Sequence, residues 1–357
     1  MLKPFITGVG IALILDFHPA GDPPLPVETL RPVASMPAHI AGTFTDLAAC
    51  HTTPDGEYLV FDRRAHSVYR VPREGPAKQI VQIGVEPGRI LLPLAFDSAP
   101  NGTFVIADAP QGTERVQIFF YLGGTAGGFT LPTRTVPQVA LGDLVLSGVG
   151  SLDYTGRTVL VSHPSSGALV TEYALDGQVL RTFGELRATG HEQDRQLHLA
   201  LNAGMTVALP DGAGFYFVFL SGVPAFRRYD AAGKLVFERH IEGPELDRHI
   251  QSLPSQWPRR KTSVGEFPIV PPSVRTAAVD PEGNLWLSLV TLQTYVYDAV
   301  GDKRRTIQFQ AAGIVAPSGL HFTTDRRLLI SPGCYTFDPA VRSSRQLAAQ
   351  LRAAVLR

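Results

Sequence analysis

Side chains that could bind a ligand or a metal gather in two long polar segments of this chain. His191 and His198 lie in the first segment, and two histidines without a third ligand do not predict a zinc site. In the second segment Trp257 precedes Arg259 and Arg260, and guanidinium groups beside an indole can hold an anionic or aromatic ligand. The alternative for these arginines is a solvated run of charge. The two segments therefore predict ligand binding and no metal centre.

Other candidates lie where strands are predicted to begin or end. Asp108 ends a strand, where an Asp commonly accepts backbone N–H bonds within its own turn, so a structural role is the alternative. His163 precedes Pro164 in a tight turn and is either a turn residue or part of a pocket wall. The predicted ligand-binding residues are Arg64, Asp108, His163, His198, Trp257, Arg259 and Arg275. We assign no catalytic residue, no metal ligand and no cofactor.

Several classes of function lack their sequence signals. The chain has no Gly-x-Ser-x-Gly nucleophile motif, no phosphate-binding loop and no dinucleotide fingerprint. Its 32 basic residues (Lys and Arg) balance 32 acidic ones, so the net charge is +0. Because no overall positive field attracts a polyanion, we expect no nucleic-acid partner.

The elements that must position these residues follow a recurring pattern. A turn is followed by two short runs of aromatic and β-branched residues, and this unit occurs six times. The turns are Pro54-Asp55-Gly56, Asn101-Gly102, Thr155-Gly156, Pro210-Asp211-Gly212, Glu282-Gly283-Asn284 and, without a glycine, Thr324-Asp325-Arg326. The shorter intervals between them match the roughly 40–50 residues of one propeller blade. The pattern predicts an all-β fold, a six-bladed β-propeller of four-stranded antiparallel blades.

Two of these repeats resemble a known family. The resemblance to NHL repeats is carried by LAFDSAPNGTFVIADAPQGTERVQIFFYLGGTAGGF (Leu94 to Phe129) and, in degenerate form, by AAVDPEGNLWLSLVTLQTYVYDAVGDK (Ala277 to Lys303). It extends from about Asp46 to Asp338. The resemblance implies a six-bladed ring. Such rings serve as protein-binding, RNA-binding and carbohydrate-linked modules, and related rings are lyases and lactonases, so it implies shape more than activity.

The two ends of the chain are predicted to differ from the blades. Residues 1–22 carry Lys3 ahead of an apolar stretch, which fits a secretory signal, with a buried strand as the alternative. The propeller is placed at residues 23–340, closed by an N-terminal strand near Thr29 to Met36 that completes the sixth blade. Residues 341–357 predict a short amphipathic helix. We expect a periplasmic or secreted protein without a stable membrane span.

The chain has two cysteines, Cys50 in the first blade and Cys334 in the sixth. These blades adjoin in a closed ring, so a disulfide could lock the seam in an oxidising compartment. We expect two separate buried thiols instead, because their strand positions suggest different distances from the ring axis. The sequence does not indicate an oligomeric state.

Two connectors between blades, residues 185–200 and 242–272, are longer than the fold requires. We expect both to roof one mouth of the central channel. The predicted function is an exported, non-catalytic propeller that binds a protein or small ligand at this loop-rich channel face. The alternative is an enzyme at the same mouth, of the metal-assisted hydrolase, lactonase or lyase type. Three or more carboxylates or imidazoles within metal-ligand distance would favour the enzyme.

Overall fold

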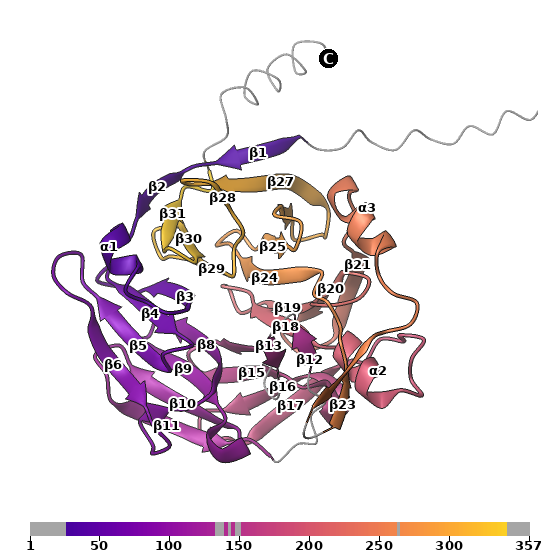
Figure 1. The fold of residues 1–357 in the computed structure, drawn as a ribbon, viewed down its shortest axis with the longest axis horizontal. Helices are drawn as coiled ribbons and strands as arrows, with labels where there is room; N and C mark the ends of the chain where they lie inside the picture. Colours follow the sequence, from indigo (N-terminus) through magenta and orange to yellow (C-terminus); the bar gives the residue numbers. More distant parts are fainter. Residues whose placement is uncertain (1–25, 133–138, 142–143, 147–150, 263–264, 341–357) are drawn as a thin grey trace, which may run out of the picture.

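The chain folds into a closed ring of six blades (Figure 1). The computed structural model describes residues 26–132, 139–141, 144–146, 151–262 and 265–340. Blades 1 to 3 consist of β3 (Leu47–Thr52), β4 (Tyr58–Asp62), β5 (Ser67–Val71) and β6 (Lys78–Ile83); β8 (Pro93–Ala99), β9 (Thr103–Asp108), β10 (Arg115–Phe120) and β11 (Thr125–Thr130); and β14 (Leu152–Tyr154), β15 (Thr158–Ser162), β16 (Ala168–Ala174) and β17 (Val179–Glu185). Each is an antiparallel meander, as the sequence predicts.

The remaining blades repeat this order. They consist of β18 (Gly204–Ala208), β19 (Gly214–Phe219), β20 (Ala225–Asp230) and β21 (Leu235–His240); β24 (Val274–Val279), β25 (Leu285–Leu289), β26 (Thr294–Tyr297) and β27 (Lys303–Gln310); and β29 (Gly319–Phe322), β30 (Leu328–Ser331), β31 (Tyr335–Phe337) and β2 (Pro32–Ser35). The first strands of neighbouring blades contact one another around the ring axis: β8 with β14, β14 with β18, β18 with β24, β24 with β29, and β29 with β3. They form the wall of the central channel.

The turn after each first strand explains why glycine recurs in the sequence. Gly56 and Gly102, for example, have φ of 78° and 86°, a left-handed conformation that a side chain disfavours. In blade 6 the equivalent turn uses Arg326 at φ 62°. This turn is held by Thr323, whose hydroxyl accepts the backbone N–H of Arg327 at 3.0 Å. The same bond occurs in blade 1, where Thr53 accepts the N–H of Glu57 at 3.2 Å in the turn with Gly56, so it supports the turn with or without a glycine.

The core lies between the faces of adjacent blades. Between blades 5 and 6, for example, Trp286 and Ile307 pack with Leu320, Leu328 and Ile330. Trp286 is 1% exposed. A single blade would leave one such face in water, so burial requires its neighbours and favours a closed ring.

The ring closes through the N-terminal strand, as predicted. β2 pairs antiparallel with β31 and supplies the outermost strand of blade 6. Just before it, β1 (Val27–Leu30) pairs parallel with β27 and adds an outer strand to blade 5. Glu28 on β1 forms an ion pair with Arg305 at 2.7 Å. The start of the described chain is therefore fastened to its last two blades.

A disulfide joins Cys50 and Cys334 across the same seam, with their Cα atoms 5.6 Å apart. The prediction of two separate thiols is wrong. The first strand of blade 1, β3, contacts β30, the second strand of blade 6, as well as β29. Cys334 is the last residue of the turn between β30 and β31, directly before β31, and from there it reaches Cys50 on the first strand of blade 1.

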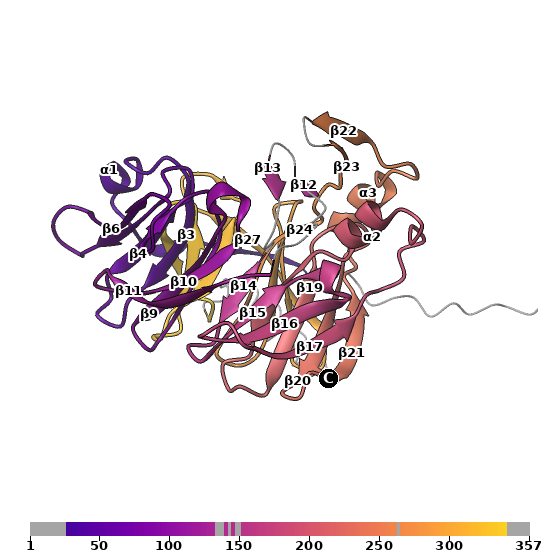
Figure 2. The same cartoon turned by 90° about the horizontal axis from the view of Figure 1, so that it is seen from below.

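Three connectors between blades carry structure of their own. The connector from blade 3 to blade 4 holds α2 (Arg195–Leu201), and the next one holds α3 (Pro244–Gln251) and the hairpin of β22 (Arg259–Thr262) and β23 (Gly265–Pro268). A third, unpredicted hairpin between blades 2 and 3 pairs β12 (Val139–Leu141) with β13 (Leu144–Leu146). Figure 2 shows all of these on one side of the ring.

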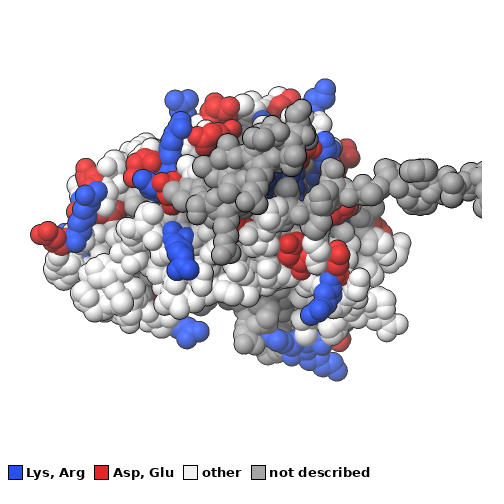
Figure 3. Space-filling model, turned by 90° about the horizontal axis from the view of Figure 1, so that it is seen from above, with Lys and Arg blue, Asp and Glu red and all other residues white. Residues whose placement is uncertain are grey.

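Smaller elements complete the described chain. They are α1 (Ala38–Ala41), the 3-10 turns Pro110–Gly112 and Pro164–Ser166, β7 (Arg89–Ile90) beside β6, and β28 (Ile314–Val315) beside β27. In the described part of the chain, no helix combines the length and apolar character needed to cross a membrane. On the side of β1 and β27, basic and acidic side chains are interspersed (Figure 3). The predicted signal segment, 1–22, and C-terminal helix, 341–357, lie outside the described residues.

Candidate functional site

A cavity of about 1210 Å³ lies between blades 3 and 4, and we call it the insertion groove. Its walls come from β17, β20 and β21, and its upper part comes from the two long connectors. The side chains used below are Phe183, Arg187, Val223, Arg227, Glu238 and Trp257. The groove therefore combines blade surface with the two long connectors, the segments that contain His198, Trp257 and Arg259 of the predicted ligand-binding residues.

The two connectors are tied to each other above the groove. Trp257 donates its indole N–H to Nε2 of His191 at 3.3 Å, and Arg259 forms an ion pair with Asp194. The Trp257 ring also packs against a cluster that includes Leu197 of α2. Asp194 caps α2 as well, by accepting the backbone N–H of Leu197. These contacts make the two insertions one roof over the groove.

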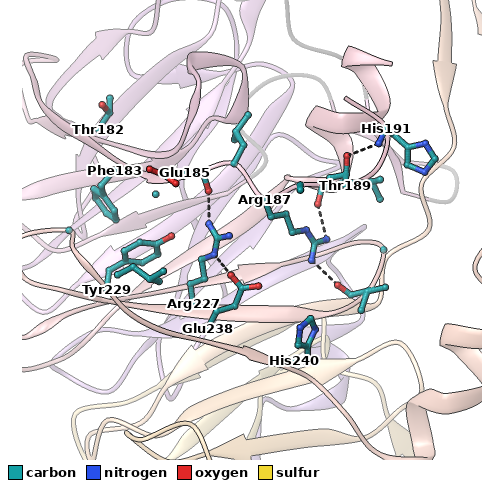
Figure 4. Close-up of a pocket in the computed structure, with 18 of the residues that line it drawn as sticks. Thr182, Phe183, Glu185, Arg187, Thr189, His191, Arg227, Tyr229, Glu238 and His240 are labelled. Carbon is teal, nitrogen blue, oxygen red and sulfur yellow. Dashed lines mark hydrogen bonds and ion pairs between the residues drawn. The ribbon is translucent and has the colours of Figure 1, made fainter. Parts of the chain in front are cut away.

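Two arginines on the groove wall have their guanidinium groups fixed by the protein (Figure 4). Arg187 donates to the backbone oxygens of Leu201, Ser221 and Val223 at 2.8–2.9 Å and lies 4.1 Å from the Phe219 ring centroid. Burial lowers the pKa of Arg187 to about 10, so it stays charged at neutral pH.

The second arginine is held by a carboxylate. Arg227 donates to Glu238 at 2.6 Å and to the backbone oxygen of Glu185 at 2.5 Å. Arg227 is 8% exposed, whereas the Glu238 side chain keeps a third of its surface. The groove thus presents a pre-positioned ion pair between apolar walls, which suits recognition of a ligand with one polar group.

Three predicted residues belong to the insertions. Trp257 lines the groove, and Arg259 belongs to its roof, where its guanidinium also reaches Gln196 at 3.4 Å. His198 lies within α2, and its Nδ1 is 2.8 Å from the hydroxyl of Thr189. The structure therefore brings these three side chains to one region, and ligand binding by them stays a prediction.

The other four predicted residues lie apart from the groove. Asp108 is fully buried at the end of β9 and accepts bonds from Arg115 at 2.8 Å and from the Leu91 N–H at 2.9 Å. His163 is buried, with Nε2 at 2.5 Å from the Ser165 hydroxyl. Arg64 and Arg275 are exposed, Arg64 in the β4–β5 turn and Arg275 at a bulge of β24. Asp108 is held by groups outside its own turn, so its contacts are structural but differ from those expected, and a binding role for the four stays a prediction.

A second cavity, of about 980 Å³, follows the central channel and is lined by the first strands of all six blades. Four ionisable side chains that were not predicted lie on its wall: His51 of β3, Asp97 of β8, Asp153 of β14 and His321 of β29. We call them the channel cluster. Among the described residues of the two insertions, none lines this cavity.

The channel cluster follows consecutive blades, 6, 1, 2 and 3. The imidazoles of His321 and His51 stack with centroids 3.9 Å apart, and His51 Nδ1 lies 2.6 Å from the hydroxyl of Ser98. Asp97 accepts the backbone N–H of Tyr154 at 2.6 Å, and Asp153 accepts that of Ala208 at 3.0 Å. Each carboxylate therefore fastens its strand to the first strand of the next blade.

Burial pushes the members of the channel cluster toward their neutral forms. It raises the pKa of Asp153 to about 6, and, together with the charge of Asp153, it raises the pKa of Asp97 well above its usual value. It lowers the pKa of His321 to about 4 and that of His51 well below its usual value. The Asp97 side chain still keeps 23% of its surface on the channel wall, so it is only partly removed from water. Both imidazoles are neutral at pH 7.

Aligning the six repeats with one another could have identified the channel cluster, because its members share a position on the first strands. All four residues lie on first strands, shortly before the turn, and each pairs with an aliphatic residue of the second strand. The pairs are His51 with Leu59, Asp97 with Val105, Asp153 with Leu160 and His321 with Leu329. In the described part of the chain, no three or more His, Cys, Asp or Glu side chains are grouped so that they could hold a metal ion.

The fold and these cavities define the class of protein as a six-bladed β-propeller. No protein-family model matches the chain, and no curated protein does. Among solved structures, it is similar to a streptogramin B lyase at 12% identity, covering 81% of this chain and 76% of that one, with a TM-score of 0.50. At this identity the likeness shows the fold alone.

Two further structures are similar at lower scores. Virginiamycin B lyase from Staphylococcus aureus matches at 9% identity over 81% of this chain and 92% of that one, with a TM-score of 0.47. Sqt1 from Saccharomyces cerevisiae matches at 12% identity over 81% and 82%, also with a TM-score of 0.47. The NHL resemblance itself stays a prediction.

Proposed function

We propose that this chain is an exported propeller that binds a small organic molecule with an aromatic or apolar body in the insertion groove. One observation carries the proposal: both long insertions converge on a cavity of about 1210 Å³ and place Trp257 on its wall. Small-molecule pockets typically occupy about 300–1000 Å³. The groove is therefore large enough for a ligand of ordinary size together with some water.

The chemistry of the lining supports this ligand class. Val223, Leu253 and Pro254 line the groove beside Trp257 and offer apolar contact. The Arg227–Glu238 pair offers one fixed polar contact, because the guanidinium is held in place while the carboxylate stays partly exposed. An aromatic body against the indole, with one polar group at the pair, would satisfy both parts.

Export is supported by the Cys50–Cys334 disulfide, since disulfides persist in oxidising compartments such as the periplasm and the exterior. A direct test is fractionation of cells that express the full chain. The mature N-terminus of the exported protein should then begin after the apolar stretch of residues 1–22. Recovery of the protein with an intact Met1 and two free thiols would contradict this part of the proposal.

Fluorescence tests binding in the groove, because the chain has two tryptophans in contrasting places. Trp257 lines the groove, whereas Trp286 is 1% exposed in the core. Titration with indole and with naphthalene-sulfonate should give a saturable change in emission. Val223→Arg should abolish it, because Val223 is 50% exposed on the groove wall. Val236→Arg, the same change at a 58% exposed valine on β21 outside the lining, should not. The same emission change in both variants would contradict the proposal.

A second candidate function, an enzyme that uses the channel, rests on a different observation. His51 Nδ1 and the Ser98 hydroxyl are 2.6 Å apart on the channel wall, the separation of a base and a nucleophile. The lowered pKa of His51 keeps its imidazole free to accept a proton. Hydrolysis of chromogenic esters and lactones that is lost in Ser98→Ala and in His51→Gln would favour the enzyme. Equal rates in all three proteins would remove it.

A further inference from the structure

The central channel offers a site of different chemistry, and we propose that it binds an organic cation held by Asp97, Asp153 and Thr206. The ligand class is a molecule with a primary ammonium or guanidinium group. No residue lines both this channel and the insertion groove, within the part of the chain that the structure describes. The proposal is therefore independent of ligand binding in the groove.

The three side chains lie on three consecutive first strands, β8, β14 and β18, and all line the channel cavity. Asp97 accepts the backbone N–H of Tyr154, which places its carboxylate beside the strand that carries Asp153. Asp153 in turn accepts the backbone N–H of Ala208, two residues beyond Thr206 on β18. The cross-blade bonds thus draw two carboxylates and one hydroxyl toward the same stretch of wall.

Thr206 supplies an independent sign of a ligand. It is 3% exposed, and its hydroxyl oxygen is buried without a hydrogen-bond partner while it lines the cavity. An unpaired buried hydroxyl is destabilising, so a partner from outside the chain would be favoured. An ammonium group carries three N–H donors. The two carboxylates, and the Thr206 oxygen once its side chain turns toward the cavity, supply acceptors for these donors.

The charges around the site also favour a cation. Of the arginines on the cavity wall, Arg63 is paired with Asp46 at 2.9 Å and Arg181 with Glu172 at 2.6 Å. The third, Arg157, is exposed in the β14–β15 turn. The stacked imidazoles of the channel cluster are neutral at pH 7. Asp153, whose pKa of about 6 leaves it mostly ionised at pH 7, then gives this part of the wall a negative charge.

Binding of a cation should release protons. Without a ligand, the two carboxyl groups hold protons to a higher pH than ordinary aspartates because they are desolvated near each other. A bound ammonium stabilises the ionised carboxylates, so protons leave them for the buffer. At pH 6 the heat of binding should therefore differ between two buffers with different enthalpies of ionisation.

The test uses the full chain and three matched probes: butylammonium, 1-butanol and butyrate. In titration calorimetry at pH 7, only butylammonium should bind. Asp153→Asn and Asp97→Asn should weaken it at least tenfold, while Thr206→Val should weaken it about threefold to tenfold. Each asparagine can still accept the cross-blade N–H bond through its side-chain oxygen, so the variants should fold, which thermal unfolding checks.

Two controls keep the outcome specific. Asp302→Asn removes a 60% exposed carboxylate on blade 5 and should leave binding unchanged, and Val223→Arg should leave it unchanged because it alters only the groove. Binding of butanol or butyrate as tightly as butylammonium would overturn the proposal. So would unchanged affinity in Asp153→Asn, or displacement of butylammonium by millimolar Mg²⁺ or Ca²⁺, which would indicate an inorganic cation site.

Discussion

The insertion groove and the channel cluster hold their ionisable side chains in opposite states: charged and paired in the groove, and desolvated in the channel. In the groove, Arg187 and Arg227 are almost fully engaged by backbone oxygens and by Glu238, so their charges are fixed and compensated. In the channel, Asp97 and Asp153 are desolvated next to each other, and burial favours their neutral forms. The insertion groove, whose ion pair and second arginine come from the two outer strands of blade 4 and from one connector residue, thus presents a rigid surface. The first strands of the blades instead make a polar wall that responds to protons and ligands.

The largest expected effect comes from the seam, which adjoins the channel and lies away from the groove. Cys50→Ala together with Cys334→Ala opens a loop that the disulfide closes over a sequence separation of 284 residues. Removing a native disulfide typically costs about 2–5 kcal/mol, and long loops fall at the upper end. We expect that loss of unfolding free energy in guanidinium titrations of the oxidised wild type and the variant.

The same variant separates the two regions. His51 directly follows Cys50 on β3, so butylammonium affinity in the channel should fall. The groove lies between blades 3 and 4, and its response to indole should stay within twofold. Each single cysteine variant also lacks the disulfide and should show the same losses, while the reduced wild type separates loss of the bond from the change of side chain. Equal losses of affinity in the channel and in the groove would show that the effect of breaking the disulfide spreads around the whole ring.

The difference between the two regions also explains which parts of the fold and of the candidate site could be predicted from the sequence. Six turns with left-handed residues specify six blades, and a sixth blade that lacks a fourth strand specifies closure by the N-terminus. Trp257 and Arg259 stood out because they lie in segments that the repeat does not require. The disulfide was missed because the packing of β3 against both β29 and β30, which brings the two cysteines together, cannot be seen from strand positions alone.

The channel cluster was missed for a geometric reason. Side chains on a strand alternate between faces, but bulges interrupt this alternation near the start of several first strands, between Leu47 and Ala49 and between Pro93 and Ala95. Which side chains reach the channel therefore cannot be counted from the strand start. Single residues such as His51 or Asp97 then look like ordinary polar positions within a short strand.

The second expected effect tests the desolvation of the channel. The pKa of Asp153 rises from 3.8 to about 6 on folding, which at 1.36 kcal/mol per pKa unit corresponds to roughly 3 kcal/mol. Because the folded pKa is raised, stability is lost as pH rises from about 4 to about 6, and the loss is complete at pH 7. Asp153→Asn should therefore be more stable than the wild type by up to about 3 kcal/mol at pH 7, and by little at pH 3.5. Denaturant titrations at both pH values check this, and a variant that is less stable at pH 7 would contradict the desolvation argument.

The third effect has the opposite pH dependence. The pKa of His321 falls from 6.5 to about 4 on folding, so the wild type loses stability as pH falls below about 6.5. His321→Gln cannot gain this charge. The unfolding free energy of the variant minus that of the wild type should therefore be about 3 kcal/mol higher at pH 4 than at pH 8. Loss of the stacking contact with His51 lowers the stability of the variant by a similar amount at every pH. The test is therefore the pH dependence of the stability difference and not its value at one pH. His240→Gln, at an exposed histidine of β21, is the matched control for the change of side chain.

The smallest effect concerns the roof of the groove. The Arg259–Asp194 ion pair is about one third exposed on both sides, and such surface pairs contribute roughly 0.2–1 kcal/mol. Arg259→Ala should therefore barely change the unfolding free energy. It releases one of the contacts that join the two insertions, so binding of indole in the groove should weaken about threefold while channel binding is unchanged. Arg304→Ala breaks an exposed ion pair on blade 5 and should change neither. If Arg259→Ala leaves groove affinity intact, the roof is held by Trp257 and its apolar neighbours alone, and the ion pair is only a surface contact.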